Sequence, residues 1–452
     1  MKRVHFIGIG GYSMSGLALW LHHQGYRVTG SDMNPSSRTE RLIQAGIPVA
    51  FGHAAEHVVG ADEVIYSPDV REDNVERRAA VESGIALRHR SDLLAEILST
   101  KRAITVSGTH GKTTTTTMIG TVLTSAGFDP SVLVGGEVDL FGGNIRVGQS
   151  HWVVAEADES DGTFLRYRPE MAVATNVEAE HLEHFNGSFE VLKAAFAQYL
   201  ETVPRDGAAV IGVDDPVLMD MSESLMVPRI TYGLSPKAQI RGDVEHQNRE
   251  GTQFRVFYKN RAMGAIRLKL PGLHNVKNAL AAVAVAQHLG ADLSMVFEAL
   301  SAFRNANRRF QILVPGPILV VDDYAHHPTE IRATLDACRQ VTPERVVVLF
   351  QPQRYVRTFR LWDEFVQAFD AADILVMTEI YSPPGEAPIA GVSGKALADA
   401  IRQRWSRPVY YVPDMFEAID LVMPILAPGD TFLTMGAGPV HKVGERVSEL
   451  LA

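Results

Sequence analysis

The sequence predicts an α/β protein with three domains, and three observations support this prediction. The chain has 452 residues, more than one hydrophobic core usually organises. Short apolar runs that end in glycine-rich or polar loops recur along it, and stretches of helix length separate them. Between residues 208 and 270 the pattern changes to short alternating strands, which indicates extra antiparallel strands. We therefore expect domains over residues 1–98, 99–312 and 313–452.

Composition limits the classes of function. Hydrophobic residues make up 46% of the chain and charged residues 21%, as in ordinary globular proteins. The net charge of −10 argues against an extended nucleic-acid interface, which needs a basic face. A single cysteine, Cys338, excludes an internal disulfide, and neither a signal-peptide profile nor an apolar run of about 20 residues is present. We expect a cytoplasmic monomer or homodimer, with no nucleic-acid or membrane partner.

The first domain opens with the pattern of a Rossmann-like nucleotide-binding unit. A strand over residues 4–9 runs into the glycine-rich segment 8–16, a helix follows, and a second strand over residues 27–30 ends at Asp32. This arrangement binds a nucleotide diphosphate and its ribose. The third glycine of the usual fingerprint is replaced by Ser13, so a purely structural turn stays as the alternative. A further strand over residues 61–66 ends at Ser67, where ligands sit in open α/β sheets.

The second domain begins with a phosphate cradle typical of P-loop ATPases. An apolar strand over residues 104–106 is followed by Ser107-Gly108-Thr109-His110-Gly111-Lys112-Thr113-Thr114 and by a helix. Backbone N–H groups of such a turn and of the helix start point at an anion. The lysine of such a motif reaches the outer phosphates, and the hydroxyl that follows it ligates Mg²⁺. Because Val106 stands where a glycine is usual, a tight turn with a surface lysine stays as the alternative.

Acidic residues follow the next strand of this domain. The apolar run 152–155 ends in Glu156-Ala157-Asp158-Glu159-Ser160-Asp161. A carboxylate at a strand end beside a phosphate cradle is the expected second anchor for Mg²⁺, whereas helix capping is the structural alternative. His181 lies in a loop after the strand 171–175, and it is equally well read as a ligand of a second metal ion or as a hydrogen-bonded loop histidine.

Two later segments also carry candidate residues. The segment 271–278 contains amides that can read a base edge, or Asn275 can simply cap the following helix. In the Rossmann-like third domain, four apolar strands end in polar loops, among them 322–328 and 351–357. Arg354 and Arg357 can clamp a carboxylate or a phosphate, and a solvated pair of arginines is the alternative.

Taken together, the motifs at residues 8–16, 107–114, 156–161 and 322–330 resemble those of the Mur ligase family, and the resemblance covers essentially the whole chain. It implies an ATP-dependent ligase of peptidoglycan precursor synthesis with ATP and Mg²⁺ as cofactors. In the implied reaction ATP phosphorylates the lactoyl carboxylate of UDP-N-acetylmuramate, and the amine of L-alanine attacks the acyl phosphate. A tetrahedral intermediate then collapses to the amide, ADP and phosphate.

The resemblance also implies roles for individual residues. The implied catalytic residues are Lys112, Glu156, His181, His326, Arg354 and Arg357. Metal ligands are implied at Thr113, Glu156 and His181. Nucleotide contacts are implied for Gly108, Thr109, His110, Gly111, Lys112, Thr113, Thr114, His274, Asn275, Asn278, Arg309, Asp323 and Tyr324. The UDP-sugar is expected at Gly10, Gly11, Ser13, Met14, Ser15, Asp32, Ser67, Glu159 and Ser160.

Some positions depart from the family pattern and leave alternatives open. Gln353 stands where a histidine is common, and Asn305-Ala306-Asn307 replaces a usual Gly-Val segment, which puts details of substrate contact in doubt. The alternatives within the superfamily are a ligase that recycles a cell-wall tripeptide onto the same UDP-sugar and a folylpolyglutamate synthase. Outside it, the alternatives are a non-catalytic nucleotide sensor and an NAD-dependent dehydrogenase that uses only the first domain.

Overall fold

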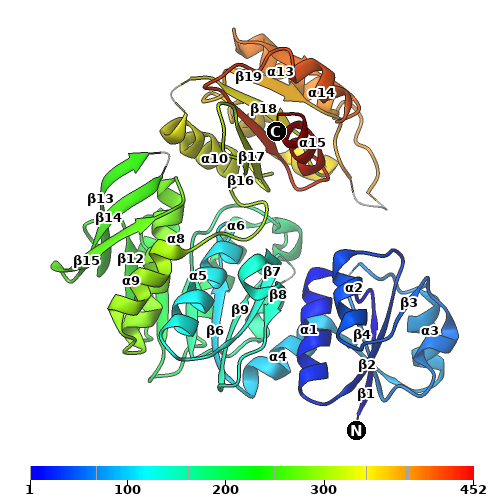
Figure 1. Ribbon diagram of the computed structural model, residues 1–452. Coiled ribbons are helices and arrows are strands. Elements are labelled where there is room, and N and C mark those ends of the chain that lie inside the picture. Colours follow the sequence, from blue (N-terminus) through cyan, green and yellow to red (C-terminus); the bar gives the residue numbers. More distant parts are fainter. Residues whose placement is uncertain are drawn as a thin grey trace. The chain divides into compact units, whose positions relative to one another are not determined.

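The computed structural model describes residues 2–67, 69–160, 162–248, 250–342, 344–382 and 386–451 (Figure 1). Two compact units divide the chain. One comprises Met1–Gly242, Val256–Gly264 and Lys277–Phe303, and the other comprises Asp243–Arg255, Ala265–Val276 and Arg304–Ala452. They are described separately below. The three domain boundaries expected from the sequence stay a prediction.

The first unit begins with a parallel sheet of five strands in the order β3-β2-β1-β4-β5. Its hydrophobic residues alternate between two faces. Val4 and Phe6 of β1 belong to the core that includes α1, whereas Ile7 packs with Ala80 of α3 on the other face. This is the Rossmann-like arrangement expected from the sequence. The strands are β1 (Arg3–Ile7), β2 (Arg27–Asp32), β3 (Val49–Phe51), β4 (Glu63–Tyr66) and β5 (Ala86–His89).

The helices of this part begin earlier than the sequence pattern indicates. The first helix starts at Tyr12, inside the segment expected to be loop, with Gly11 in extended backbone just before it. Ser13, Met14 and Ser15 therefore form the first turn of a helix. The helical elements are α1 (Tyr12–His23), α2 (Ser37–Gln44), η1 (Ala55–Val58), α3 (Val75–Glu82) and α4 (Arg90–Ser99).

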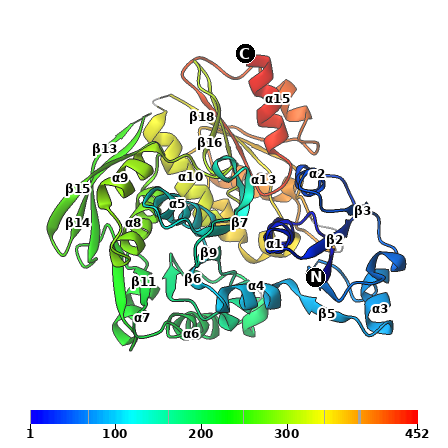
Figure 2. The ribbon, with the colours of Figure 1, turned by 60° about the horizontal axis from the view of Figure 1, so that its bottom comes forward.

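A second, mixed sheet follows in the same unit, and its strands run in the order β12-β11-β10-β6-β9-β7-β8. All neighbours are parallel except β7 and β8. The helix α5 packs along β6, β9 and β7, as Figure 2 shows from another side. The strands are β6 (Arg102–Ser107), β7 (Ser131–Val138), β8 (Gly143–Arg146), β9 (Trp152–Glu156), β10 (Met171–Ala174), β11 (Ala208–Gly212) and β12 (Arg229–Gly233).

The expected short strands after residue 208 are present. β12 pairs with the first residues of β13 (Ile240–Asn248), and β14 (Gly251–Tyr258) and β15 (Arg261–Leu268) come next in the chain. The helical elements between residues 112 and 302 are α5 (Lys112–Ser125), η2 (Asp139–Phe141), η3 (Thr163–Arg166), η4 (Leu182–Phe185), α6 (Phe189–Leu200), α7 (Pro216–Ser224), α8 (Leu273–His288) and α9 (Leu293–Ala302).

The second unit contains a sheet in the order β16-β17-β21-β18-β19-β20, in which only β16 runs antiparallel to its neighbour. The four strands expected from the sequence are β17 (Leu319–Asp323), β18 (Val346–Phe350), β19 (Ile374–Met377) and β21 (Thr431–Met435). The edge strands β16 (Gln311–Val314) and β20 (Val409–Tyr411) lacked such a signal. The helices are α10 (Pro328–Val341), α11 (Tyr355–Arg360), α12 (Trp362–Val366), α13 (Gly394–Arg404), α14 (Glu417–Val422) and α15 (His441–Leu451).

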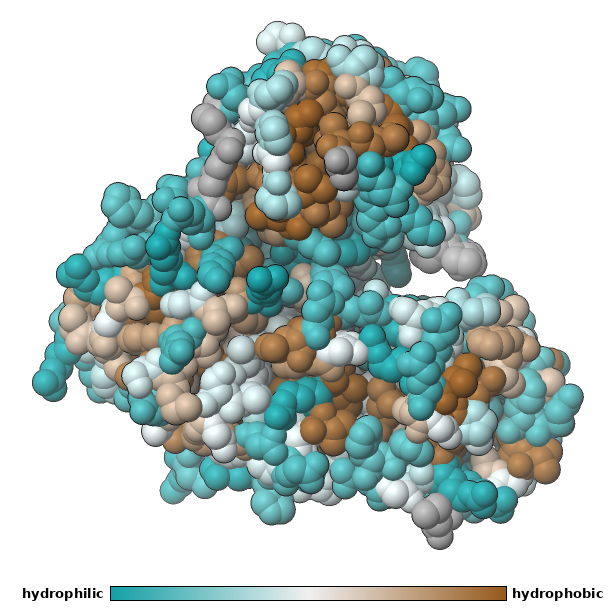
Figure 3. Space-filling model, in the orientation of Figure 1, coloured by the Kyte–Doolittle hydropathy of each residue, from teal (hydrophilic) through white to brown (hydrophobic). Residues whose placement is uncertain are grey.

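Hydrophilic residues cover much of the face drawn in Figure 3, with hydrophobic patches between them. Among the helices of the described residues, none combines the length and the hydrophobicity that crossing a bilayer requires.

A buried carboxylate holds together the polar side of the first sheet. Glu76 of α3 is fully buried, and its Oε1 lies 2.6 Å from Nδ1 of His57. Ser31 donates a hydrogen bond of 2.5 Å to Oε2. Burial alone would raise the pKa of Glu76, but His5, Ser31 and His57 around the carboxylate lower the pKa to about 2. Glu76 therefore stays ionised in the folded protein at every pH above that value.

We expect the substitution Glu76→Gln to destabilise this unit by about 3 kcal/mol at neutral pH, because a lowered folded-state pKa stabilises the fold above the unfolded pKa of about 4.5. The difference between wild type and variant should shrink as pH falls from about 4.5 toward 2. Urea unfolding at a series of pH values measures it. Glu82→Gln, an exposed position on the same helix, is the control. A difference that grows with acidification would contradict the assignment.

Candidate active site

The segment between β6 and α5 forms a tight glycine turn that opens a helix. Gly108 has φ +139° and Gly111 has φ +81°, both backbone conformations that side chains rarely adopt. A Cβ atom on Gly108 would lie 2.0 Å from Oγ1 of Thr175, and one on Gly111 would lie 2.9 Å from Oδ1 of Asn278. Both positions thus favour glycine by conformation, and Gly108 also by space, because its Cβ would lie 3.1 Å from backbone atoms of Asn176.

The turn is held by the residues that follow the neighbouring strand β10. Asn176 accepts a hydrogen bond from the backbone N–H of His110 at 2.8 Å and donates one to the carbonyl of the same residue at 3.0 Å. Thr175 donates to that carbonyl at 2.6 Å, and the Thr109 hydroxyl accepts from the backbone of Glu178 at 2.9 Å. These bonds fix the conformation of the cradle.

Lys112, the first residue of α5, forms an ion pair with Glu159. Its Nζ lies 2.9 Å from both carboxylate oxygens of Glu159 and donates to the carbonyl of Gly108 at 2.5 Å. The Glu159 side chain is only 2% exposed. Burial alone would lower the pKa of Lys112, but Glu159 and Asp158 outweigh it and raise the pKa. The cradle therefore presents a charged ammonium group beside its backbone N–H groups.

The predicted magnesium ligands Thr113 and Glu156 both approach a pair of glycines in β7. A Cβ atom on Gly135 would lie 2.8 Å from Oε2 of Glu156, and one on Gly136 would lie 3.3 Å from Cγ2 of Thr113. The N–H of Gly135 donates to Oε1 of Glu156 at 2.6 Å. Within the described residues the Thr113 hydroxyl makes no hydrogen bond, although the residue is buried. Carboxylate and hydroxyl oxygens suit Mg²⁺, so these donors fit the predicted ion.

The later threonines of the run that begins α5 are buried in the protein interior. Thr115, Thr116 and Thr117 are fully buried, and Thr117 donates to the backbone carbonyl of Thr113 at 2.8 Å. The hydroxyl groups of Thr115 and Thr116 make no hydrogen bond within the described residues. The poor helix propensity of this run is therefore offset by burial.

A cavity of about 560 Å³ lies at the carboxyl ends of the first sheet. Its lining includes the predicted residues Gly10, Gly11, Asp32 and Ser67, and also Arg38 and His53, which the sequence analysis did not single out. Asp32 accepts a hydrogen bond of 2.8 Å from the N–H of Gly10. These four predicted positions are therefore together in one place.

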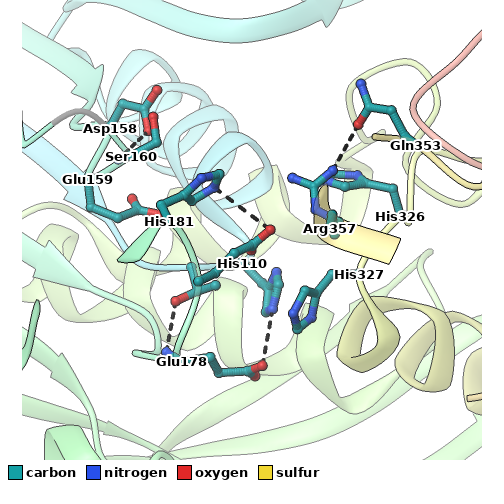
Figure 4. A network of polar contacts seen from close by, with 12 residues as sticks. His110, Asp158, Glu159, Ser160, Glu178, His181, His326, His327, Gln353 and Arg357 are labelled. Carbon is teal, nitrogen blue, oxygen red and sulfur yellow. Dashed lines mark hydrogen bonds and ion pairs between the residues drawn. The ribbon is translucent and has the colours of Figure 1, made fainter. Parts of the chain in front are cut away.

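The five other positions expected near the UDP-sugar lie outside the lining of that cavity, namely Ser13, Met14, Ser15, Glu159 and Ser160. Met14 and Ser15 are 1% exposed in α1, where the Ser15 hydroxyl donates to the carbonyl of Gly11 at 2.9 Å. Ser160 follows the buried Glu159 and donates its N–H to Asp158 at 3.0 Å, as seen in Figure 4. Asp161 lies outside the described residues. The roles of these residues in substrate binding stay predictions.

A second cavity, of about 230 Å³, is lined by residues from the parts of the first unit that contain its two sheets. Ser13 and Arg90 line it from one side, and Glu156 and Asp158 line it from the other. Arg90 donates to the Ser13 hydroxyl at 3.3 Å. Arg90 was not among the predicted residues, although its place directly after β5 is the same signal that identified Ser67. Asn144 of β8, also in the lining, had no signal in the sequence.

The histidines of the cradle region have acidic neighbours. His181 has φ +55° and lies 3.8 Å from Oε1 of Glu180 and 3.9 Å from Oε1 of Glu183. Nε2 of His110 lies 3.5 Å from Oε2 of Glu178, as Figure 4 shows. Carboxylates around a histidine suit a cation, but they equally suit a hydrogen-bonded loop, so both alternatives for His181 stay open.

The amides expected near adenosine have different surroundings. Asn275 is buried and donates to the carbonyl of Pro271 at 2.8 Å, which favours its structural role at the start of α8. Asn278 lies against Gly111 of the cradle. His274, at the helix start, approaches Gly272 so closely that a Cβ there would lie 2.6 Å from its ring.

In the second unit, Asp323 organises the loop after β17. Its carboxylate accepts hydrogen bonds from the N–H groups of Phe310 at 2.7 Å and Ala325 at 2.8 Å. Burial raises the pKa of Asp323 to about 6. The Arg309 guanidinium lies 5.1 Å from the ring centre of Tyr324. Four of the predicted residues, Arg309, Asp323, Tyr324 and His326, thus belong to one cluster with Glu330.

The two arginines after β18 are held differently. Arg354 is exposed and has φ +67°, a strained conformation for a residue with a side chain. Arg357, one helical turn on, donates to Oε1 of Gln353 at 3.0 Å (Figure 4). Gln353 therefore orients one of the two predicted substrate-binding arginines.

We expect Gly108→Ala to abolish nucleotide binding by the cradle, because its Cβ would overlap Thr175. Gly127→Ala is the matched control, since Gly127 also has a positive φ, +83°, but open space around it. Both variants pay the conformational strain of about 1–2 kcal/mol, and only the first has the steric overlap. Binding of a fluorescent ATP analogue, with thermal unfolding as a check, separates them. Equal binding by the two variants would disprove the steric assignment.

Three sequence models of the Mur ligases match the chain in order. The model described as Mur ligase family, catalytic domain, matches residues 3–102, and the Mur ligase middle domain matches residues 106–286. The model described as Mur ligase, glutamate ligase domain, matches residues 308–438.

Full-length relatives and solved structures agree with these matches. The UDP-N-acetylmuramate–L-alanine ligase of Symbiobacterium thermophilum is 47% identical over 100% of this chain and 95% of its own length, and that of Syntrophus aciditrophicus is 43% identical over 98% and 92%. The structure of UDP-N-acetylmuramate-alanine ligase MurC from Thermotoga maritima has a TM-score of 0.86 at 32% identity, with 100% and 99% of the two chains covered. The murein peptide ligase of Psychrobacter arcticus has a TM-score of 0.73 at 25% identity, with 100% and 99% covered. The chain belongs to the Mur ligase family.

Proposed function

We propose that this protein is an ATP-dependent ligase that joins L-alanine to the lactoyl carboxylate of UDP-N-acetylmuramate, in the synthesis of peptidoglycan precursors. The full-length relatives with this name support the choice of substrates. The observation that carries the proposal is a cavity lined by Glu156 and Asp158 on one side and by Ser13 and Arg90 on the other. Lys112 of the phosphate cradle pairs with Glu159, the residue that follows Asp158. A phosphate cradle thus adjoins a place for an acid.

The chemistry requires activation of the acid. A carboxylate has no leaving group that an amine can displace, so ATP must first convert it to an acyl phosphate. The enzyme then needs mainly to position the reacting groups and to neutralise charge. Lys112 carries the charge for the transferred phosphoryl group, and the N–H groups of Gly111 and of the start of α5 hold the remaining phosphates.

The residues that would hold Mg²⁺ are Thr113 and Glu156. The Glu156 carboxylate lies at Gly135 and the Thr113 side chain at Gly136, where the missing Cβ atoms leave room. The ion would supply neutralisation of phosphate charge. His181 remains a candidate ligand for a second ion, next to Glu180 and Glu183.

The acid substrate is expected with its uridine diphosphate in the 560 Å³ cavity and its carboxylate toward Arg90. Arg90 is the cationic residue in the lining of the smaller cavity, opposite Glu156 and Asp158. A guanidinium group is suited to a carboxylate because it can donate two parallel hydrogen bonds.

We expect a product with the mass of the alanine adduct when the protein is incubated with ATP, UDP-N-acetylmuramate and a mixture of amino acids. Glycine and serine differ from alanine by little binding energy in a small pocket, so competition in one mixture is the sharpest measurement. Phosphate release should require both the sugar nucleotide and the amino acid. Release that occurs without an amino acid, or a product that lacks the mass of the alanine adduct, would reject this proposal.

The double substitution Lys112→Met with Glu159→Gln should lower kcat by about 100- to 1000-fold, since a charge that acts on the transferred phosphoryl group is lost. Removal of both partners avoids leaving Glu159 buried without a counter-charge. The control is Lys193→Met, whose ion pair with Glu190 lies on the exposed side of α6. Turnover close to wild type in the double variant would rule out the role of Lys112.

The substitution Glu156→Gln should raise the Mg²⁺ concentration required for half-maximal rate by at least about tenfold, because a neutral amide ligates Mg²⁺ more weakly than a carboxylate. Rates measured over a series of Mg²⁺ concentrations test this. Saturating Mg²⁺ should restore part of the activity. An unchanged Mg²⁺ dependence would remove Glu156 from the metal site.

A further inference from the structure

A third cavity, of about 430 Å³, lies at the first sheet, and the proposed reaction does not use it. It is lined by the beginnings of β1 and β2, by His57 of η1 and by the segment that precedes β4. None of its lining residues belongs to the 560 Å³ cavity at the other end of the strands. Cavities of this size are typical of small-molecule sites.

Two neighbouring arginines, Arg3 and Arg27, line this cavity. Arg3 is paired with Arg27 in the parallel register of β1 and β2, so two positive side chains neighbour each other on one face of the sheet. Within the described residues neither guanidinium has an ion-pair partner. The nearby Asp62 carboxylate accepts a hydrogen bond of 2.7 Å from the backbone N–H of Arg3, not from its side chain. Like charges on adjacent strands are destabilising unless an anion compensates them.

Two histidines lie deeper in the same lining. His57 is anchored through Nδ1 to the buried Glu76 at 2.6 Å, which leaves Nε2 for another partner. A carboxylate on one ring nitrogen fixes the orientation of a histidine. His5 is 2% exposed, its Nδ1 lies 2.9 Å from the Thr29 hydroxyl, and its Nε2 lies 3.6 Å from Oε2 of Glu76.

The remaining lining contains no carboxylate. Besides the arginines and histidines it is formed by Thr29 and by small or apolar residues, namely Val4, Gly30, Pro48, Val49, Ala50, Val59, Gly60 and Ala61. A ligand here therefore meets positive charge at one end and an apolar wall beside it. This combination suits an anionic group that is attached to a small organic body.

We propose that this cavity binds a small phosphate ester, with the phosphate group between Arg3 and Arg27 and with His57 as a further donor. A phosphate offers several oxygens to several donors, and guanidinium groups bind it through paired hydrogen bonds. Arg3, Arg27 and the segment 59–61 place this site toward the amino ends of the strands, away from the loops after β1 and β2 that line the 560 Å³ cavity. The ligand would therefore be an effector rather than a reactant.

Calorimetric titration with glycerol 3-phosphate tests the proposal. UDP and a non-hydrolysable ATP analogue are kept saturating, so that the other two phosphate-binding places are occupied. We expect one equivalent to bind at millimolar concentration. Arg3→Gln with Arg27→Gln should weaken binding at least tenfold, and His57→Gln should weaken it severalfold. Arg78→Gln, an exposed arginine on α3 of the same sheet, should change it less than twofold.

Three results would overturn the proposal. One is the absence of binding to the wild-type protein at millimolar concentration. Another is equal weakening by the Arg78 control, which would indicate a general charge effect. The third is co-sedimentation with phosphatidic acid vesicles without binding of glycerol 3-phosphate, because a lipid headgroup would then be the source of the phosphate. Unchanged thermal unfolding and unchanged ligase turnover in the Arg3/Arg27 variant separate this site from the proposed active site.

Discussion

The ion pair between Lys112 and Glu159 is the interaction on which the candidate active site depends. The Lys112 ammonium group is held between the carbonyl of Gly108 and the buried carboxylate of Glu159, so these two groups define its position. In the proposed function, triphosphate oxygens would compete with Glu159 for this ammonium group. An exchange of one anion for another costs less than the dehydration of a free ammonium, because the lysine never returns to bulk water.

The geometry around this pair follows from sheet order. β9 and β10 flank β6, so Glu156 and Thr175 come directly beside the turn at Gly108. The backbone can pass this closely only where side chains are missing, at Gly108, Gly111, Gly135 and Gly136. The apolar strands thus bring the polar residues together, while the glycines provide the space in which a phosphate and an ion fit.

Local patterns predicted much of this, since a strand, a glycine turn and a helix follow each other within a few residues at Gly108–Lys112. The doubly covered parallel sheets and the clustering of Gly10, Asp32 and Ser67 were also accessible from strand ends. Asn144 and Gly135 were not, because only the pairing of β7 and β8 brings them to the site. Glu76 carried no sequence signal either, since its importance arises from three histidines that are distant in the chain. The edge strand β20 is three residues long, too short for an alternation to be recognised.

Asn144 of β8 donates hydrogen bonds to the Tyr12 carbonyl and to the Ser15 hydroxyl, and Arg38 of α2 lies 3.3 Å from Glu137 of β7. These contacts join the sheet that is expected to hold the sugar nucleotide to the sheet that forms the cradle. The distance between the two proposed binding sites is consequently set by the fold. For the proposed reaction, this fixed span would disfavour acids shorter or longer than the lactoyl ether. Folding orders the protein groups once, so that substrate binding alone has to bring the two reactants into line at each turnover.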